Sequence, residues 1–409
     1  MSEELISPLG VKLPAGWNLS RIGDMCSKIG SGATPKGGAT VYVDSGVNFI
    51  RSQNVFDHRF SEVGLACIDD QAAQKLVGVT VIERDVLLNI TGDGETIARC
   101  CVAPASALPA RVNQHVMILR TGSQLDPGYL QRYLSQPAMR HYMLSHNSGG
   151  SRRALTKGQV GDFRIAVPPI EVQRAIASVL GALDDKIAVS ERIAATADEL
   201  ASQLYLSASI RSPESFTECP LTSAGEFING RAFTKDATGA GRMVIRIAEI
   251  NSGPGGSTVY NELEVPEKHV ARPGDVLFAW SGSLTVARWF RPEAIINQHI
   301  FKCIPKNGNP HWLIHRLIHR KIDDFRAIAA DKATTMGHIQ RKHLDEVVAT
   351  PTAEMVADLN SRISPLWERA LTAEQEGLAL AALRDALLPQ LMSGRLRVKD
   401  AEKIAEDQV

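Results

Sequence analysis

A long helical stretch in the middle of the chain restricts the possible folds more than any other feature. Apolar residues recur through residues 170–206 at the alternating spacing of four and three that marks a coiled-coil seam. These seam positions are Ile176, Leu180, Leu183, Ile187, Ala194, Ala197, Ala201 and Leu204. A proline pair at 168–169 precedes the stretch and the segment 211–213, RSP, ends it, so we expect a helix of about 37 residues and about 55 Å. Such a narrow apolar stripe requires a partner helix to cover it.

The chain offers a partner near its end, over residues 352–396. A second seam runs through this segment, with a break of small residues around Gly377. The seam consists of Ile363, Leu366, Ala370, Ala373, Leu380, Leu383, Leu387 and Leu391. Two such helices in one chain predict an intramolecular antiparallel coiled coil with a globular part at each end.

Composition restricts the function classes. The 409 residues contain 45 basic and 45 acidic side chains, so the net charge of zero gives no global attraction to nucleic acid or membrane, and any basic site must be local. The six cysteines form no C-x-x-C pair and no regular framework, which favours a reducing compartment. Neither an apolar leader nor a run of 18 apolar residues occurs, so we expect a cytoplasmic protein that is not bound to a membrane.

Short motifs recur in the same order in the two halves of the chain, which indicates an internal duplication. RDVLL is matched by GDVLF, and VNQHV is matched by INQHI. The matched segments are 49–51 with 244–246, 84–88 with 274–278, 112–116 with 296–300 and, at a shifted offset, 30–32 with 228–230. Each half is rich in predicted strands and leads into one of the long helices.

The expected fold class is therefore α+β, with two β-rich domains related by internal duplication and joined by the two long helices in an antiparallel coiled coil. The expected boundaries are a first β-rich domain at 1–169, a central helix at 170–211, a second β-rich domain at 212–351, a C-terminal helix at 352–396 and a tail at 397–409.

Catalytic motifs are missing from the sequence. It has no G-x-x-x-x-G-K-[ST] phosphate loop, no H-E-x-x-H zinc motif and no G-x-S-x-G nucleophile motif. His311, His315 and His319 could lie on one face of a helix, where two of them could share a metal ion. No carboxylate stands at a matching spacing, and a partly exposed helix stripe is the alternative interpretation.

Basic charge is concentrated at equivalent places in the two halves. Residues 134–164 carry five basic side chains against one acid, and residues 311–343 carry seven against three, so each has a local net charge of +4. Such patches suit contacts with phosphate, although basic loops that are only solvated remain an alternative. Two modules on a rigid spacer also match two half-sites on one duplex.

Two polar loops contain the side-chain types that read base edges. The predicted base contacts are Arg51, Ser52, Gln53, Asn54, Arg246, Glu249 and Asn251. The predicted contacts with the DNA backbone are Arg152, Arg153, Lys157, Arg341 and Lys342. For Asn113, Gln114 and His115, which lie in a strand-like run, a buried polar bracket is at least as good an interpretation as DNA contact.

The segment LTKGQVGDFRIAVPPIEVQRAIASVLGALDDKI, residues 155–187, resembles the junction between a target-recognition domain and the central helix in specificity subunits of Type I restriction-modification systems. Further similar segments extend the resemblance over nearly the whole chain. They are GSGATP at 30–35, DVLLNITGDGETIA at 85–98, NQH at 113–115, GDVLFAWSGSL at 274–284, INQHI at 296–300 and GHIQRKHL at 337–344. The second copy departs from the pattern at 352–354, where TAE replaces the Pro-Pro-Ile-Glu run.

The resemblance implies a non-catalytic subunit that binds double-stranded DNA and reads a bipartite, gapped target with two target-recognition domains. It implies as partners two methylation subunits, which use S-adenosylmethionine to methylate adenine, and restriction and motor subunits, which use ATP and Mg²⁺. No cofactor would be bound by this chain.

The outer face of the central helix is the predicted subunit interface, with a solvated charged face as the alternative. This face comprises Glu171, Gln173, Asp184, Asp185 and Lys186. A competing function class is a duplicated coiled-coil scaffold that binds other proteins rather than DNA. Because phosphate-dominated binding weakens steeply with salt, a salt titration separates the two classes.

Overall fold

The computed structural model describes residues 6–93, 96–146, 153–235, 237–331 and 337–407. The chain divides into two compact units, which we describe separately. The first unit comprises Met1–Asp185 and Leu380–Val409, and the second comprises Lys186–Ala379. The division falls within both long helices, so each unit combines a β-rich part with a segment of each helix.

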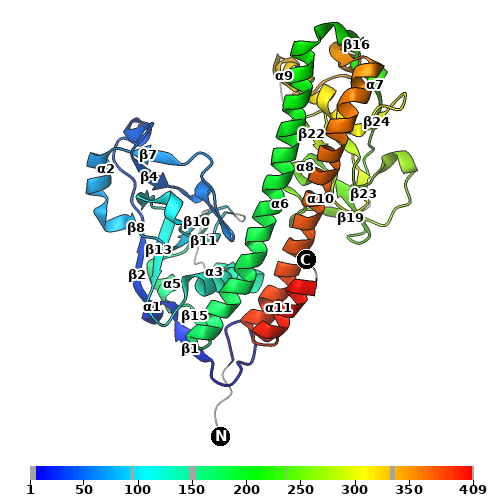
Figure 1. Ribbon diagram of the computed structural model, residues 1–409. Helices are drawn as coiled ribbons and strands as arrows, with labels where there is room; N and C mark the ends of the chain where they lie inside the picture. The colour runs from blue at the N-terminus through cyan, green and yellow to red at the C-terminus, as the bar shows by residue number, and fades with distance from the viewer. Residues whose placement is uncertain (1–5, 94–95, 147–152, 236, 332–336, 408–409) are drawn as a thin grey trace. The chain divides into compact units, whose positions relative to one another are not determined.

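Both long helices are present. Helix α6 spans Ile170–Arg211, which is 42 residues, and α10 spans Ala353–Met392, which is 40 residues. In the second unit the two helices lie side by side (Figure 1). Ala194 and Ala197 of α6 share a buried cluster with Ala370 and Ala373 of α10. Further along α6, Tyr205 shares a core cluster with residues nearer the start of α10, so the pairing is antiparallel as predicted.

The predicted seam of α6 is largely correct. Ile176, Leu180 and Leu183 are buried in the first unit, and the predicted alanines are buried in the second. Tyr205, rather than the predicted Leu204, is the buried residue near the end of the helix. Its hydroxyl donates to the carbonyl of Ala349 at 3.0 Å, a polar contact that an apolar seam pattern does not predict.

Two larger sheets build the β-rich part of the first unit. One is antiparallel, with the order β11 (Cys100–Val102), β9 (Val86–Asn89), β13 (Val116–Thr121) and β2 (Cys26–Ser31). The other has the order β3 (Tyr42–Val43), β7 (Ala66–Ile68), β4 (Val47–Ile50), β12 (Ala110–Val112) and β8 (Thr80–Val81), with β4 and β12 parallel. Leu87 and Ile118 of one sheet share a buried cluster with Ile50 and Val112 of the other. The two sheets therefore pack on a common core.

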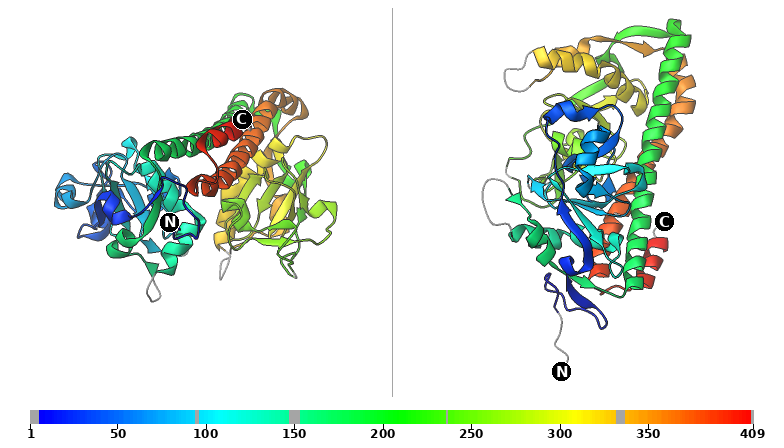
Figure 2. Two further views of the ribbon diagram at one scale, coloured as in Figure 1. Left: turned by 90° about the horizontal axis from the view of Figure 1, so that it is seen from below. Right: turned by 90° about the vertical axis from the view of Figure 1, so that its left-hand side faces the viewer.

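Shorter elements complete the first unit. The paired strands are β1 (Asn18–Arg21) with β15 (Arg164–Val167), β10 (Thr91–Gly92) with β14 (Arg153–Ala154), and β5 (Val55–Phe56) with β6 (Arg59–Phe60). The helices are α1 (Ile22–Met25), α2 (Asp70–Lys75), α3 (Pro127–Ser135), α4 (Pro137–Ser145), α5 (Lys157–Asp162) and α11 (Val398–Asp407). The 3-10 turns are η1 (Gly38–Val41), η2 (Ser52–Asn54), η3 (Val77–Val79) and η4 (Ala105–Ala107). Figure 2 shows α11 beside the end of α10, and Ala401 is fully buried. The predicted tail is therefore mostly a packed helix.

The second unit repeats this plan. One antiparallel sheet has the order β17 (Gly225–Asn229), β24 (Ile300–Pro305), β21 (Val276–Ala279) and β22 (Thr285–Arg288). The other has the order β19 (Val259–Asn261), β18 (Arg242–Ile245), β23 (Ala294–Ile296) and β20 (Val270–Ala271), with β18 and β23 parallel. The remaining elements are β16 (Phe216–Pro220) paired with β25 (Val347–Pro351), helices α7 (Leu221–Ala224), α8 (Ile247–Ser252) and α9 (His311–Asp331), and 3-10 turns η5 (Pro213–Ser215), η6 (Glu267–His269) and η7 (Arg341–Asp345).

Strand order confirms the duplication. The sequence β2, β13, β9, β11 across one sheet corresponds to β17, β24, β21, β22, and β7, β4, β12, β8 corresponds to β19, β18, β23, β20. Even the single parallel pair of each second sheet recurs, as β4 with β12 and β18 with β23. The predicted α+β fold is confirmed. None of the helices in the described ranges is both long and apolar enough to cross a membrane.

Candidate nucleic-acid interface

A cluster of loops in the first unit is held together by backbone hydrogen bonds. We define the first loop cluster as residues 30–34, 90–93, 113–116 and 153–157. The amide of Ile90 donates to the carbonyl of His115 at 3.0 Å, and the amide of Leu155 donates to the carbonyl of Ile90 at 2.8 Å. The amide of Gly32 donates to the carbonyl of Val116 at 2.9 Å. Four segments far apart in sequence thus form one surface region.

The second unit forms the same cluster from equivalent residues. We define the second loop cluster as residues 228–231, 280–284, 297–300 and 337–341. The amide of Trp280 donates to the carbonyl of His299 at 3.1 Å, and the amide of Ile339 donates to the carbonyl of Trp280 at 3.1 Å. The amide of Gly230 donates to the carbonyl of Ile300 at 2.9 Å. The duplication therefore preserves the backbone scaffold of these loops as well as the sheets.

One glycine in each cluster is required by a close approach of the backbone. A Cβ on Gly32 would clash with the carbonyl oxygen of Val112, and a Cβ on Gly230 would clash with that of Asn297. Because only glycine leaves room for this approach, the GSG and ING segments are equivalent despite their shifted offset.

The Asn-Gln-His motif of each half has a buried asparagine and an exposed glutamine. Asn113 is buried, and its side-chain oxygen accepts from the amide of His115 at 3.1 Å. Asn297 is also buried and accepts from the amide of Phe233 at 3.1 Å. The bracket interpretation is therefore correct for Asn113, and Asn297 forms a similar bracket in the second unit. The glutamine that follows, Gln114, is exposed.

Of the predicted base contacts in the first unit, Asn54 lies in the interior. Its exposed fraction is zero, its side-chain oxygen accepts from the amide of Arg51 at 3.0 Å, and its Nδ2 donates to the carbonyl of Ser61 at 3.0 Å. The guanidinium of Arg51 donates to the carbonyl of Gly64 at 2.7 Å. This burial corrects the prediction for Asn54, which braces the loop because its polar atoms are already satisfied by the protein. Gln53 is exposed.

The second unit has a similar brace in which a carboxylate, that of Glu249, takes the place of the Asn54 amide. Glu249 is 2% exposed and pairs with Arg246, whose Nη2 lies 2.6 Å from Oε1 of Glu249. Burial alone would raise the pKa of Glu249, but hydrogen bonds from Arg246 and Thr258 hold it below its ordinary value. The prediction of a base contact by Glu249 is therefore corrected in the same way. Asn251 is exposed.

A local signal for both braces was present in the sequence. Arg51 and Asn54, like Arg246 and Glu249, stand three residues apart at the start of a helical turn, and in each pair the side chain of the later residue accepts from the backbone amide of the arginine. This is the spacing of a capping box, which satisfies backbone donors at a helix start. An unusual arginine at the first position concealed the motif.

The side chains predicted to contact the DNA backbone are exposed where the structure describes them. Lys157 at the start of α5 is exposed, as are Arg341 and Lys342 at the start of η7. Arg152 and the side chain of Arg153 lie outside the described residues. Some other basic side chains of the two +4 regions are engaged within the protein. Arg140 pairs with Asp57, for example, and Arg316 donates to Ser202.

The predicted subunit-interface face of α6 includes two inward-facing residues. Gln173 has an exposed fraction of zero, and its Oε1 accepts from the amide of Asp126 at 2.9 Å while its Nε2 donates to the carbonyl of Pro168 at 2.8 Å. It therefore fixes the start of α6 to the β-rich part and cannot form an outer surface. Glu171, Asp185 and Lys186 are exposed.

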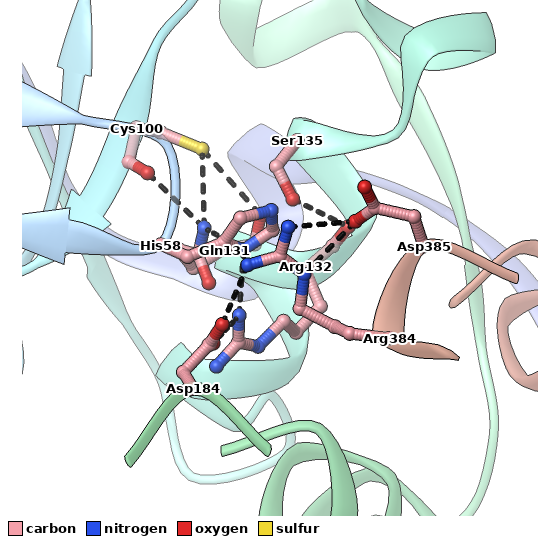
Figure 3. A network of polar contacts seen from close by, with 8 residues as sticks. All are labelled: His58, Cys100, Gln131, Arg132, Ser135, Asp184, Arg384 and Asp385. Carbon is pink, nitrogen blue, oxygen red and sulfur yellow. Dashed lines mark hydrogen bonds and ion pairs between the residues drawn. The ribbon is translucent and has the colours of Figure 1, made fainter. Parts of the chain in front are cut away.

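Asp184, the other inward-facing residue, is the centre of a polar network that we call the first clasp (Figure 3). It forms ion pairs with Arg132 of α3 and with Arg384 of α10, the latter at 2.8 Å. Arg132 and Gln131 both donate to Nδ1 of His58, and Gln131 also donates to the carbonyl of Cys100 at 3.1 Å. Burial, together with the charge of Arg132, lowers the pKa of His58 to about 4. His58 is therefore a neutral acceptor at neutral pH.

A second clasp occupies the second unit, with the charges reversed. Arg288 at the end of β22 pairs with Asp198 of α6 at 3.1 Å and with Glu374 of α10 at 2.8 Å. Its guanidinium also lies 4.4 Å from the ring centroid of Trp367. Burial raises the pKa of Glu374 even though Arg288 opposes this shift.

The histidines of α9 form a partly exposed stripe, in line with the alternative interpretation, because His311 and His319 are exposed and His315 is partly buried. His315 makes an edge contact with Trp367 at 5.3 Å, and burial lowers its pKa to about 3, helped by the neighbouring Arg316 and Arg288. The ring centroids of His315 and His319 are 6.3 Å apart. Within the described ranges, no group of three or more His, Cys, Asp or Glu side chains is arranged to hold a metal ion.

The fold and these clusters define a duplicated α+β protein in which two similar loop surfaces are each built on a sheet pair beside long helices. Residues 14–198 match the family model of the Type I restriction modification DNA specificity domain. The Type I restriction enzyme MjaIX specificity subunit of Methanocaldococcus jannaschii is 20% identical over 95% of both chains. The S subunit of a Type I restriction-modification system from M. genitalium matches in fold with a TM-score of 0.59 and 14% identity, over 94% of this chain and 99% of that chain. Over residues 14–198 the chain thus matches the DNA specificity domain, and over nearly its whole length it is similar to Type I specificity subunits, the family that its motifs resemble.

Proposed function

We propose that this protein reads a bipartite, gapped sequence in double-stranded DNA, with one half-site for each unit. The match of residues 14–198 to a DNA specificity domain supports target recognition in general. The observation that carries the bipartite form is the duplicated loop cluster, in which the same backbone hydrogen bonds present a different set of side chains in each unit. A conserved scaffold with variable side chains suits a reader of two unlike half-sites.

Exposed basic residues beside the loop clusters are the proposed contacts with phosphate. Lys157 serves the first unit, and Arg341 and Lys342 serve the second. Such contacts set the position of the protein on the duplex, whereas discrimination needs side chains that reach base edges. The exposed polar side chains proposed for that role are Gln53, Gln114, Asn251 and Gln298. Arg51, Ser52 and Arg246 are retained only as partly exposed supports of the same loops.

The long helices are the proposed spacer between the half-sites. A helix advances about 1.5 Å for each residue, so the lengths of α6 and α10 would set the gap that the two units can bridge. The proposed function of these helices is therefore geometric, and they need not contact a base.

Partner subunits would supply all catalysis. We propose that two methylation subunits bring S-adenosylmethionine, and that restriction and motor subunits bring ATP and Mg²⁺. Glu171, Asp185 and Lys186 remain the proposed contacts with a methylation subunit, because they are exposed on α6. This chain would act in the cytoplasm as a non-catalytic subunit.

Selection from a pool of random-sequence duplexes tests this function. The chain, purified with any subunits that accompany it, should enrich two short sequences at a fixed separation. Its affinity should fall steeply as salt rises, because each phosphate contact releases counterions. Enrichment of a single uninterrupted sequence would contradict the bipartite form. A lack of affinity for any duplex at low salt would instead favour the scaffold that binds other proteins.

A further inference from the structure

A cavity opens in the second loop cluster. It has a volume of about 360 Å³ and is lined by Asn229, Trp280, Phe301, His338, Gln340 and Arg341, with Ile339 between them. All these residues belong to the second unit. The cavity combines an aromatic wall with amide and guanidinium groups, which is a composition suited to a planar, polar ligand.

Trp280 is held rigidly in the wall of this cavity. Its indole Nε1 donates to Oδ1 of Asn229 at 2.8 Å, while its ring lies 5.0 Å from His299 and 5.8 Å from Phe301 between centroids. The ring is partly exposed, in contrast to Trp289 and Trp312, which are each 3% exposed. A fixed aromatic surface of this kind loses little side-chain entropy when a ligand stacks on it.

The fold does not require an aromatic residue at this position. In the first unit Ile90 occupies the equivalent place, with the same backbone hydrogen bonds to the neighbouring loops, and it is 6% exposed. His115, the counterpart of His299, hydrogen-bonds Thr91 at 2.6 Å rather than stacking on a ring. The shared backbone scaffold therefore forms without an aromatic residue here, and Trp280 adds an aromatic surface to it.

We propose that this cavity binds one nucleobase of the target DNA, taken out of the duplex and stacked on Trp280. Within a duplex the faces of the bases are covered by their neighbours and only base edges are open, so the face of the indole can stack only on a base that has left the stack. Arg341 lies at the rim and Lys342 follows it, which places positive charge where the attached phosphate would pass. The inference rests on the proposed function, because it names a contact within the second half-site.

Stacking would contribute affinity at this half-site. Stacking of a base on an aromatic side chain is sequence-tolerant, and its loss on alanine substitution weakens binding by about 5- to 150-fold. Any preference among bases would arise from the polar groups around the indole, which include Gln340 and Asn229.

The test compares Trp280→Ala, Trp280→Phe and a control, Phe290→Ala. Phe290 is a partly exposed aromatic residue that follows β22, and Trp280 follows the end of β21. Because the two strands are antiparallel, Phe290 lies beside the start of β21, where the amide of Trp289 donates to the carbonyl of Asp275, and Trp280 lies at the other end. Each full-length variant, with its accompanying subunits, is titrated against the duplex selected by the wild type and against copies with a single abasic site at each position of the second half-site.

We expect Trp280→Ala to weaken binding to the intact duplex by about 5- to 150-fold, with Trp280→Phe in between and Phe290→Ala unchanged. With the abasic site at one position, the wild type and Trp280→Ala should bind equally, because the stacking partner is gone. A Trp280→Ala variant that binds the intact duplex as tightly as wild type would overturn the proposal, and so would a loss that persists equally at every abasic position.

Failure of the proposed function would give a different result. In that case the wild type itself would select no duplex, and no variant could be compared. If Trp280→Ala does not fold, as judged by circular dichroism, Trp280→Phe and the wild type across the abasic series still decide the matter. The proposal then predicts that Trp280→Phe binds the intact duplex more weakly than the wild type and that the two bind equally when the stacked base is missing. A difference that persists equally at every abasic position would count against stacking.

Discussion

Both clasps attach a β-rich part to the long helices, and they do so with opposite arrangements of charge. In the first unit one carboxylate, Asp184, lies between two guanidinium groups, those of Arg132 and Arg384. In the second unit one guanidinium, that of Arg288, lies between two carboxylates. Each clasp joins the β-rich part of its own unit to its segments of α6 and α10. Duplication has thus preserved the strands and loop scaffold, while the attachment to the helices has been built independently in each unit.

The two units also differ near the start of their long helices. Gln173 satisfies backbone groups on both sides of the junction in the first unit. In the second unit the indole of Trp312 donates to Asn360 of α10 at 2.8 Å instead. The first turns of α10 are thus tied to another element, α9, rather than to the loop before a short helix.

The largest effect is expected from removing the shared carboxylate. Asp184→Ala leaves the guanidinium of Arg132, whose side chain is 9% exposed, without its carboxylate, while Arg384, 16% exposed, keeps only its pair with Asp385. We expect a loss of about 3 kcal/mol in the free energy of unfolding of the first unit, measured by urea denaturation. Asp185→Ala, at the exposed neighbouring position, should change it by less than about 0.5 kcal/mol. Equal effects of the two substitutions would contradict the clasp.

A smaller loss is expected from Arg288→Met. The two carboxylates left behind keep more contact with water, since their side chains are 42% and 22% exposed. We expect a loss of about 2 kcal/mol in the free energy of unfolding of the second unit. Arg369→Met on α10 breaks an exposed pair with Glu376 and should cost no more than about 0.5 kcal/mol. If Arg288→Met costs more than Asp184→Ala, the ranking by burial is wrong.

Acid should affect the first clasp through His58. Its pKa is about 4 in the folded protein and its ordinary value is 6.5, so between these pH values the unfolded chain binds more protons. Stability contributed by the neutral imidazole is therefore complete above pH 6.5 and is lost as pH falls towards 4, by on the order of 2 kcal/mol.

The variant His58→Asn isolates this effect. Asparagine tolerates the positive φ of 65° at this position and does not titrate. Its unfolding free energy should fall less than that of the wild type between pH 6.5 and pH 4. His141→Asn, at an exposed position on α4, should retain the full pH dependence. Parallel pH profiles for His58→Asn and wild type would contradict the assignment.

The smallest effects separate bracing from reading in the polar loops. Asn54→Ala removes a buried hydrogen-bond partner and should cost about 1 to 2 kcal/mol of stability without changing which bases are preferred. Gln53→Ala, at the exposed neighbouring position, should leave stability unchanged and alter one half-site. Urea denaturation and duplex selection measure the two properties. A changed preference in Asn54→Ala at full stability would restore it as a base contact.

The sequence predicted features that repeat along the chain. The heptad spacing of residues 170–206 corresponds to a long helix, and the segments VNQHV and INQHI lead into equivalent paired strands. Both features were predictable because helix periodicity and repeated motifs can be recognised in short stretches of sequence. Chain order alone therefore indicated two modules and two long helices.

The inward or outward direction of single polar residues was not predictable in the same way. Asn54 and Gln53 are neighbours of similar chemistry, but only Asn54 meets the carbonyl of Ser61, which a turn brings back from seven residues further on. Gln173 looks like an exposed residue in the first turn of a helix, yet the loop before α3 packs over it. Such directions depend on tertiary contacts that spacing does not encode.

The central claim is that the long helices measure the distance between two half-sites. Inserting one heptad between Lys186 and Ile187 and another between Ala379 and Leu380 lengthens both helices by about 10 Å and nearly preserves their facing surfaces, with a drift of about 20°. Duplex selection with this variant should return the two wild-type half-sites, separated by about three additional base pairs. An unchanged separation with intact half-sites would contradict the account.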